Sequence, residues 1–269
     1  MSDDLLGKIY KEVRKSGYPT ELIVNKKFQS KDWCCTENQY YIDLDENKGR
    51  EIDLSAHKSR QCHALEDISV WSKLSIEIKK CKKPWVIFTS DKKNTDTGGY
   101  GFLNHINNIS NEILSYHAIM EKHPSSLFNR LGRNAFIPFT KDNPQIFSAL
   151  LSSVKSCIER HRADLDHKEA YNESSYDIVF YSPLVIVDSR LFEAYLENND
   201  ELKINEAEHI VYSFNYASPN YKSKQYLVDI VTLSGLDNYL DQQSVWIDSI
   251  FNTLHSRINA KNTQDSLTT

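Results

Sequence analysis

Apolar residues near the start of the chain recur at the spacing of two amphipathic helices. Residues 3–15 carry leucine, isoleucine, tyrosine and valine three or four positions apart, which places them on one side of a helix. A glycine and a proline then interrupt the pattern and predict the start of a second helix over residues 19–30. On that helix Glu21 shares a face with Val24 and Phe28, so we expect a carboxylate on its buried side.

Alternation with a period of two follows and predicts strands. "WCCTENQYYIDLD" and "EIDLSAHK" flank the turn "DENKGR" and predict a β-hairpin, while "KLSIEIKK" and "CKKPWVIFTSD" predict two further strands. Side chains of a strand point alternately to its two faces, so Asp53 points away from its apolar neighbours, and so do Glu77 and Lys79. If the two strands are neighbours, these three ionisable groups can meet.

Helical and strand patterns are mixed in the rest of the chain. Helices are predicted over 102–123 and 143–162, with a short third one in "RLFEAYLEN". "YDIVFYSPLVIVDS" predicts a long buried strand, and "AEHIVYSFNYAS" and "QYLVDIVTL" predict two more. A closing helix over 235–258 precedes a polar tail, 259–269, that we expect to be disordered.

This order of elements predicts one α/β domain over residues 1–258, with a mixed central sheet flanked by helices. Its core is expected in 1–93 and 176–258, with a largely helical insertion at about 94–175. The chain of 269 residues is 40% hydrophobic and 26% charged, which is the composition of an ordinary folded protein. No signal-peptide pattern and no membrane-spanning run is present, so we expect a cytoplasmic protein.

The net charge of −5 is unevenly distributed. Residues 1–93 carry 18 Lys and Arg against 15 Asp and Glu, a balance of +3, which leaves 14 against 22, or −8, for the remainder. The end of the Glu77 strand is the most basic place, with Lys80, Lys82 and Lys83 close together. A polyanionic partner on this side of the molecule is compatible with that asymmetry, although a solvated lysine-rich edge is the plainer interpretation.

Asp53, Glu77 and Lys79 form a pattern with a specific chemistry. Two carboxylates a few ångström apart repel one another, and a divalent cation relieves that repulsion. Oxygen ligands suit Mg²⁺ or Mn²⁺ better than zinc, and a lysine beside the ion can orient a water molecule toward a phosphate. The structural alternative is a cross-strand ion pair that involves Lys79 and needs no metal.

An acid, a gap of 24 residues and then E-x-K, with the acids on adjacent strands, resembles the signature of the PD-(D/E)xK nuclease superfamily, whose fold is called restriction-endonuclease-like. "SGYPTE", "REIDLSA" and "LSIEIKKCKKPWVIF" together carry this resemblance over about the first ninety residues. Upstream, Glu21 is similar to the extra helical glutamate of some members, with Glu12 as a second candidate. The proline that precedes the first acid in the family is replaced by Ile52.

The resemblance implies a metal-dependent nuclease. Asp53, Glu77, Glu21 and the backbone carbonyl of Ile78 would hold Mg²⁺ or Mn²⁺, and Lys79 would orient or activate the attacking water. Lys80, Lys82 and Lys83 would contact phosphates of the nucleic acid, expected to be DNA. The resemblance also implies a homodimer or a partner protein that supplies targeting, in a bacterial or mobile-element setting of defence or repair.

Three alternatives compete with this interpretation. A catalytically silent member of the same fold that binds nucleic acid or protein is the main one, because no recognisable DNA-reading motif is present. Cys157 and His161 have a spacing that can bind zinc on a helix, but no second pair accompanies them and no C-x-x-C occurs among the five cysteines. No nucleophile-elbow motif supports a serine hydrolase.

Overall fold

The computed structural model describes residues 3–62, 68–93, 96, 103–110, 113–140, 144–166, 175–221 and 224–268. Its helices are α1 (Asp3–Lys15), α2 (Tyr18–Ser30), α3 (Tyr116–Glu121), the short 3₁₀ helix η2 (Pro124–Leu127), α4 (Pro144–Asp166) and α5 (Leu236–Thr268). Its strands are β1 (Cys34–Asp43), β2 (Lys48–Cys62), β3 (Ile68–Lys80), β4 (Trp85–Asp91), β5 (Leu103–Asn107), β6 (Arg130–Phe136), β7 (Tyr176–Asp188), β8 (Leu191–Leu196), β9 (Leu202–Ala207), β10 (His209–Tyr216) and β11 (Lys224–Thr232).

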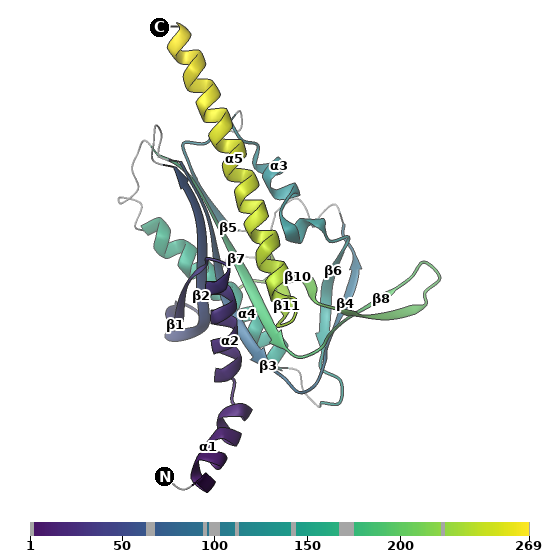
Figure 1. The fold of residues 1–269 in the computed structure, drawn as a ribbon. Coiled ribbons are helices and arrows are strands. Elements are labelled where there is room, and N and C mark those ends of the chain that lie inside the picture. Colours follow the sequence, from purple (N-terminus) through teal and green to yellow (C-terminus); the bar gives the residue numbers. More distant parts are fainter. Residues whose placement is uncertain are drawn as a thin grey trace.

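All of these strands belong to one mixed sheet in the order β1-β2-β3-β7-β11-β10-β6-β4-β8-β9, with β5 paired to β7 outside this path (Figure 1). The first three strands form an antiparallel meander, and β7 then lies parallel to β3 along the full length of both. A parallel neighbour requires a crossover connection, and α4 belongs to the segment that supplies it.

Helices cover both faces of this sheet. Val24 and Phe28 of α2 and the apolar side of α5 pack with Ile76 and Ile78 of β3 on one face. On the other face α4 packs against β7 residues of the opposite parity, among them Val185. The central strand β7 is therefore buried on both sides, which explains its nearly continuous apolar sequence.

The first ninety residues follow the sequence prediction closely. The two helices and the hairpin are confirmed, and the "KLSIEIKK" strand is longer than predicted, since β3 begins at Ile68. The helix at 143–162 and the three strands predicted after it are confirmed as α4, β7, β10 and β11. Most of the glycine-rich stretch 91–101 lies outside the described residues.

The segment at about 94–175, expected to be a largely helical insertion, contains α3, η2 and α4 but also adds strands β5 and β6 to the sheet. Residues 102–123, predicted as one helix, contain strand β5 and only the short helix α3, and β6 was not predicted at all. Both strands find their partners far away in the sequence: β5 pairs with β7, and β6 pairs with β4 and β10. These long-range pairings decide the structure of segments whose local apolar spacing favours a helix.

Two further predictions near the end of the chain are wrong. "RLFEAYLEN" is predicted as a short helix, but it forms β8, which lies between β4 and the unpredicted β9. The tail 259–269, expected to be disordered, continues α5 as far as Thr268. Extending an existing helix is far less costly than starting one, and this tail contains good helix formers such as alanine, lysine and glutamine.

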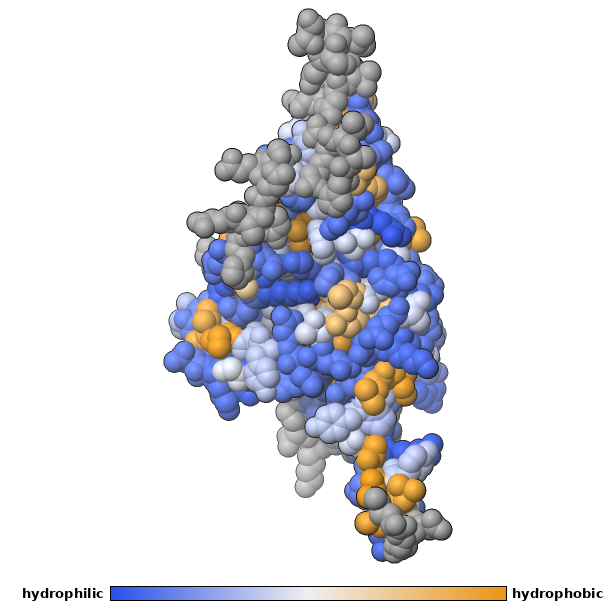
Figure 2. Space-filling view, turned by 60° about the vertical axis from the view of Figure 1, so that its left-hand side comes forward, coloured by the Kyte–Doolittle hydropathy of each residue, from blue (hydrophilic) through white to orange (hydrophobic). Residues whose placement is uncertain are grey.

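The N-terminal helix α1 projects from the body of the molecule and exposes its apolar stripe. Leu5, Leu6, Ile9, Tyr10 and Val13 are each between 46 and 60% exposed, and the stripe is visible at the foot of Figure 2. None of the described helices is both long enough and apolar enough to cross a membrane.

Candidate active site

Neighbouring strands bring Asp53 and Glu77 together, as strand parity predicts. Leu54 of β2 lies opposite Ile76 of β3, so Asp53 and Glu77 are the next residues along the two strands. The Asp53 carboxylate accepts a hydrogen bond from the backbone N–H of Ile78 at 2.7 Å. The N–H and C=O of a strand residue point to the same side, so the Ile78 carbonyl also faces the Asp53 strand, as a ligand role requires.

Lys79 lies between the two acids. Its ammonium donates a hydrogen bond to Glu77 Oε2 at 2.5 Å and lies 3.6 Å from Asp53 Oδ2. The Glu77 carboxylate is buried, because its side chain is only 6% exposed. Glu77 and Lys79 have the strand parity of the α4 face of the sheet, whereas Asp53 also lines a cavity on the α2 side.

Burial dominates the electrostatics of this group. It raises the pKa of Glu77 to about 7, against the opposing effect of the Lys79 ammonium and with a further increase from the Asp53 carboxylate. For Lys79, burial favours the neutral amine, but the two carboxylates outweigh it and raise its pKa above the ordinary value. The Lys79 ammonium is therefore the member of the pair that stays charged near neutral pH.

Glu21 approaches this group from α2. Together with Asp53 and Ile78 it lines a cavity of about 230 Å³. Burial and the nearby Asp53 carboxylate raise the pKa of Glu21. The first turn of α2 is tied to the sheet by Thr20, whose hydroxyl donates to the Asp188 carboxylate at 2.7 Å. Glu21 is thus brought close to the predicted site, whereas Glu12 lies on the projecting helix α1.

Two residues of the same cavity were missed by the sequence interpretation. Glu37 and Asn38 of β1 line it beside Glu21 and Asp53. The Glu37 carboxylate accepts a hydrogen bond from the Asn25 side chain of α2, which ties the two elements together. A lone acid in the strand "CCTENQYY" is the signal that could have identified Glu37, but only the register of the predicted hairpin, with Glu37 opposite Leu54, puts it beside Asp53.

The candidate ligands are carboxylate oxygens and a peptide carbonyl oxygen, which are the ligands that a hard divalent cation such as Mg²⁺ prefers. As these side chains are arranged, however, no group of three or more acidic, histidine or cysteine side chains within the described residues is set to hold a metal ion. The Glu77 carboxylate accepts a hydrogen bond from the Lys79 ammonium, and the Asp53 carboxylate accepts one from the Ile78 amide. Glu77 would have to exchange its bond to Lys79 for the metal.

The three lysines predicted to contact nucleic acid have different surroundings. Lys80 donates to the carbonyls of Arg14 and Ser16, at 2.6 and 3.3 Å, and so holds the end of α1. Lys83 donates to the carbonyl of Phe139. Lys82 is exposed and has no side-chain partner within the described part of the chain.

The alternative zinc pair is accounted for by packing. Cys157 is buried in α4, and the His161 ring packs edge-on against Tyr181 at 5.0 Å. The His161 Nε2 atom also lies 3.2 Å from the carbonyl oxygen of Asn104. Both side chains therefore belong to the contact between α4 and strands β5 and β7.

Comparisons of the chain with protein-family models, with curated proteins and with solved structures find no match.

Proposed function

We propose that this chain is a metal-dependent nuclease of the PD-(D/E)xK type, with the restriction-endonuclease-like fold, acting on DNA. The observation that carries the proposal is the position of the Lys79 ammonium between two carboxylates of adjacent strands, 2.5 Å from Glu77 and 3.6 Å from Asp53. The helical Glu21, which lines a cavity with Asp53, supports it further. Bacterial or mobile-element defence or repair is the proposed setting.

Asp53, Glu77 and the Ile78 carbonyl would hold Mg²⁺ or Mn²⁺, and Glu21 would complete the ligand set or hold a second ion. When bound, such an ion polarises the phosphate and lowers the pKa of a coordinated water molecule. Lys79 keeps its proton at neutral pH, so it acts as a hydrogen-bond donor that orients the attacking water and the phosphate oxygens. A P–O bond forms to the water oxygen and the bond to the 3′ oxygen breaks, which leaves a 5′-phosphate and a 3′-hydroxyl.

The proposal is tested by incubating supercoiled plasmid and labelled single-stranded DNA and RNA with the protein and Mg²⁺ or Mn²⁺. We expect cleavage that EDTA abolishes and that Lys79→Ala reduces by about two orders of magnitude or more, the scale on which a positioned hydrogen-bond donor contributes to catalysis. Lys73→Ala is the matched control, because Lys73 lies on the same strand and face but pairs with Asp164. Cleavage at the wild-type rate by Lys79→Ala would contradict the assignment.

A catalytically silent binding module is the second candidate, and the Glu77–Lys79 ion pair favours it because that pair satisfies the acid without a metal. Thermal melting with and without Mn²⁺ distinguishes the two. A metal site should raise the melting temperature in proportion to the logarithm of the Mn²⁺ concentration above its dissociation constant. Asp53→Asn should remove this dependence. If wild type and Asp53→Asn melt alike at every Mn²⁺ concentration, the silent module is the better description.

A further inference from the structure

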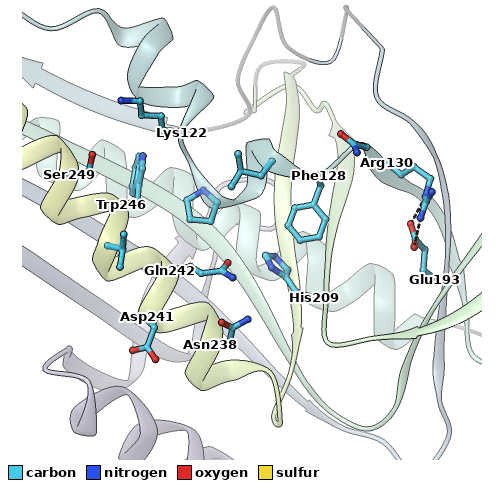
Figure 3. A pocket seen from close by; sticks show the side chains of 14 residues that line it. Lys122, Phe128, Arg130, Glu193, His209, Asn238, Asp241, Gln242, Trp246 and Ser249 are labelled. Carbon is cyan, nitrogen blue, oxygen red and sulfur yellow. Dashed lines mark hydrogen bonds and ion pairs between the residues drawn. The ribbon is translucent and has the colours of Figure 1, made fainter.

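A second and larger cavity, of about 880 Å³, lies between α5, the segment from η2 to β6, and β10 (Figure 3). Its volume falls in the range of small-molecule sites. It shares no lining residue with the cavity beside Asp53. The aromatic side chains Phe128 and Trp246, the imidazole of His209 and the amides of Asn238 and Gln242 are the lining groups that matter here.

His209 is held in place from behind by a buried acid. The Asp229 carboxylate, only 1% exposed, lies 2.8 Å from His209 Nε2 and accepts further hydrogen bonds from the hydroxyls of Ser125 and Tyr239. A carboxylate partner of this kind fixes the orientation of an imidazole. The second ring nitrogen, Nδ1, forms no hydrogen bond with any residue that the structure describes, so it is available to a ligand.

The aromatic walls of the cavity are equally fixed. Phe128 packs against the His209 ring with centroids 4.6 Å apart, and the Trp246 indole N–H donates to the carbonyl of Ile119 at 3.2 Å. Trp246 is only 4% exposed, because Phe180 and His123 pack against its ring, so it forms part of the cavity floor and Phe128 is the ring that a ligand can contact more fully. Rigid rings of this kind are platforms on which planar molecules stack.

Polar groups with unused hydrogen-bonding capacity complete the cavity. Asn238 and Gln242 lie four residues apart on α5, are exposed, and point toward His209 in Figure 3. Their amides and the Lys122 ammonium have no hydrogen-bond partner in the described part of the chain. Arg130 differs, because its guanidinium already donates two hydrogen bonds, of 2.8 and 2.9 Å, to the Glu193 carboxylate.

We propose that this cavity binds a purine nucleotide. An amide side chain can donate to and accept from one edge of an adenine at the same time, while an aromatic ring such as that of Phe128 stacks on one face of the base. Lys122, at one edge of the cavity in Figure 3 with His209 nearer its middle, supplies a cation for the phosphate. The base is recognised by Gln242 and Asn238 beside His209, and the phosphate by Lys122. The same chemistry is offered by a free nucleotide and by a base of single-stranded DNA.

The test is calorimetric titration of the intact protein with AMP, with adenosine and with a short single-stranded oligo-dA, all in EDTA so that no cleavage occurs. We expect AMP to bind, and Gln242→Ala to weaken its binding about tenfold, the effect of losing one well-formed hydrogen bond pair. Asn252→Ala, which removes an exposed amide of the same helix outside the cavity, should bind like wild type. Lys122→Ala should bind AMP and adenosine with equal affinity.

Binding of AMP with these variant effects would support a site for the free nucleotide, and binding of oligo-dA alone with the same effects would support DNA as the source of the base. No binding of either by the wild-type protein would overturn the proposal. So would AMP binding that Gln242→Ala and Lys122→Ala leave unchanged. Because the assay contains no divalent metal, its result is independent of whether the chain is a nuclease.

Discussion

The Glu77 side chain is buried at the candidate site and has the Lys79 ammonium as its hydrogen-bonded partner. Because burial raises the pKa of Glu77 from 4.5 to about 7, the folded chain binds a proton there that the unfolded chain has already lost. Folding stability therefore falls as the pH rises through the window from about 4.5 to 7. Such a destabilised carboxylate is a common feature of sites that work on a bound ion or substrate.

A pH series of thermal melts of the metal-free protein and of Glu77→Gln tests this assignment. The wild-type protein should lose stability relative to Glu77→Gln between pH 5 and pH 8, by on the order of 3 kcal/mol if the full pKa difference is expressed. The glutamine keeps the shape of the side chain but cannot ionise, so it lacks this part of the pH dependence. Parallel melting curves for the two proteins over this range would show that Glu77 does not titrate there.

Among the secondary-structure elements, α4 and the β1–β2 hairpin are joined by a buried ion cluster. The Lys155 ammonium, 5% exposed, lies 2.8 Å from Asp43 and 2.9 Å from Asp45. Burial opposes its charge, but the hydrogen bonds that it donates to the two acids raise the pKa of Lys155. The cluster fixes the hairpin that carries Asp53, so the candidate site depends on it indirectly.

Replacing Lys155 by methionine should destabilise the protein by about 3–5 kcal/mol, because it leaves the buried Asp43 carboxylate without its cation. Lys203→Met is the control, since Lys203 forms its ion pair with Glu201 on the surface and such pairs contribute about 1 kcal/mol or less. Urea denaturation gives both values. A loss in Lys155→Met as small as that in the control would mean that the cluster does not hold the hairpin.

For the whole molecule, charge limits how nucleic acid can be bound. The protein is acidic overall, and its modest excess of positive charge is confined to residues 1–93. Two of the three lysines beside the candidate site are already engaged with backbone carbonyls, which leaves Lys82 as the member of that group free to meet a phosphate. Weak, salt-sensitive binding of DNA is therefore expected, unless a partner or a second copy of the chain adds further cations.

Binding of a DNA duplex measured against salt concentration tests this expectation. Replacing Lys82 by alanine should reduce the slope of log affinity against log salt by about 1, the effect of one lost phosphate contact. Lys203→Ala, in the acidic part of the chain, should leave the slope unchanged. An unchanged slope in Lys82→Ala would place the nucleic-acid contacts elsewhere on the surface.

The candidate site and the first part of the fold were predictable because their signals are local. Alternation along two strands already turns Asp53, Glu77 and Lys79 away from their apolar neighbours, and the short turn "DENKGR" makes β1 and β2 neighbours. A carboxylate on the apolar side of a helix likewise marks Glu21. Glu37 was missed because the sequence predicts the hairpin but not its register, which sets Glu37 opposite Leu54 and so next to Asp53.

By itself, then, the sequence determined the α/β class, the first two helices, the first hairpin and the orientation of three ionisable side chains away from their apolar neighbours. Only the tertiary structure decided that β5, β6 and β8 are strands, because each pairs with a segment distant in the chain whose position local spacing does not encode. The tertiary structure alone also forms the large cavity, because η2, β10 and α5 meet there and His209 lies within hydrogen-bond distance of Asp229. The periodicity of a segment indicates which of its faces is buried. Which other helix or strand packs against that face is decided only by the packing of the whole chain.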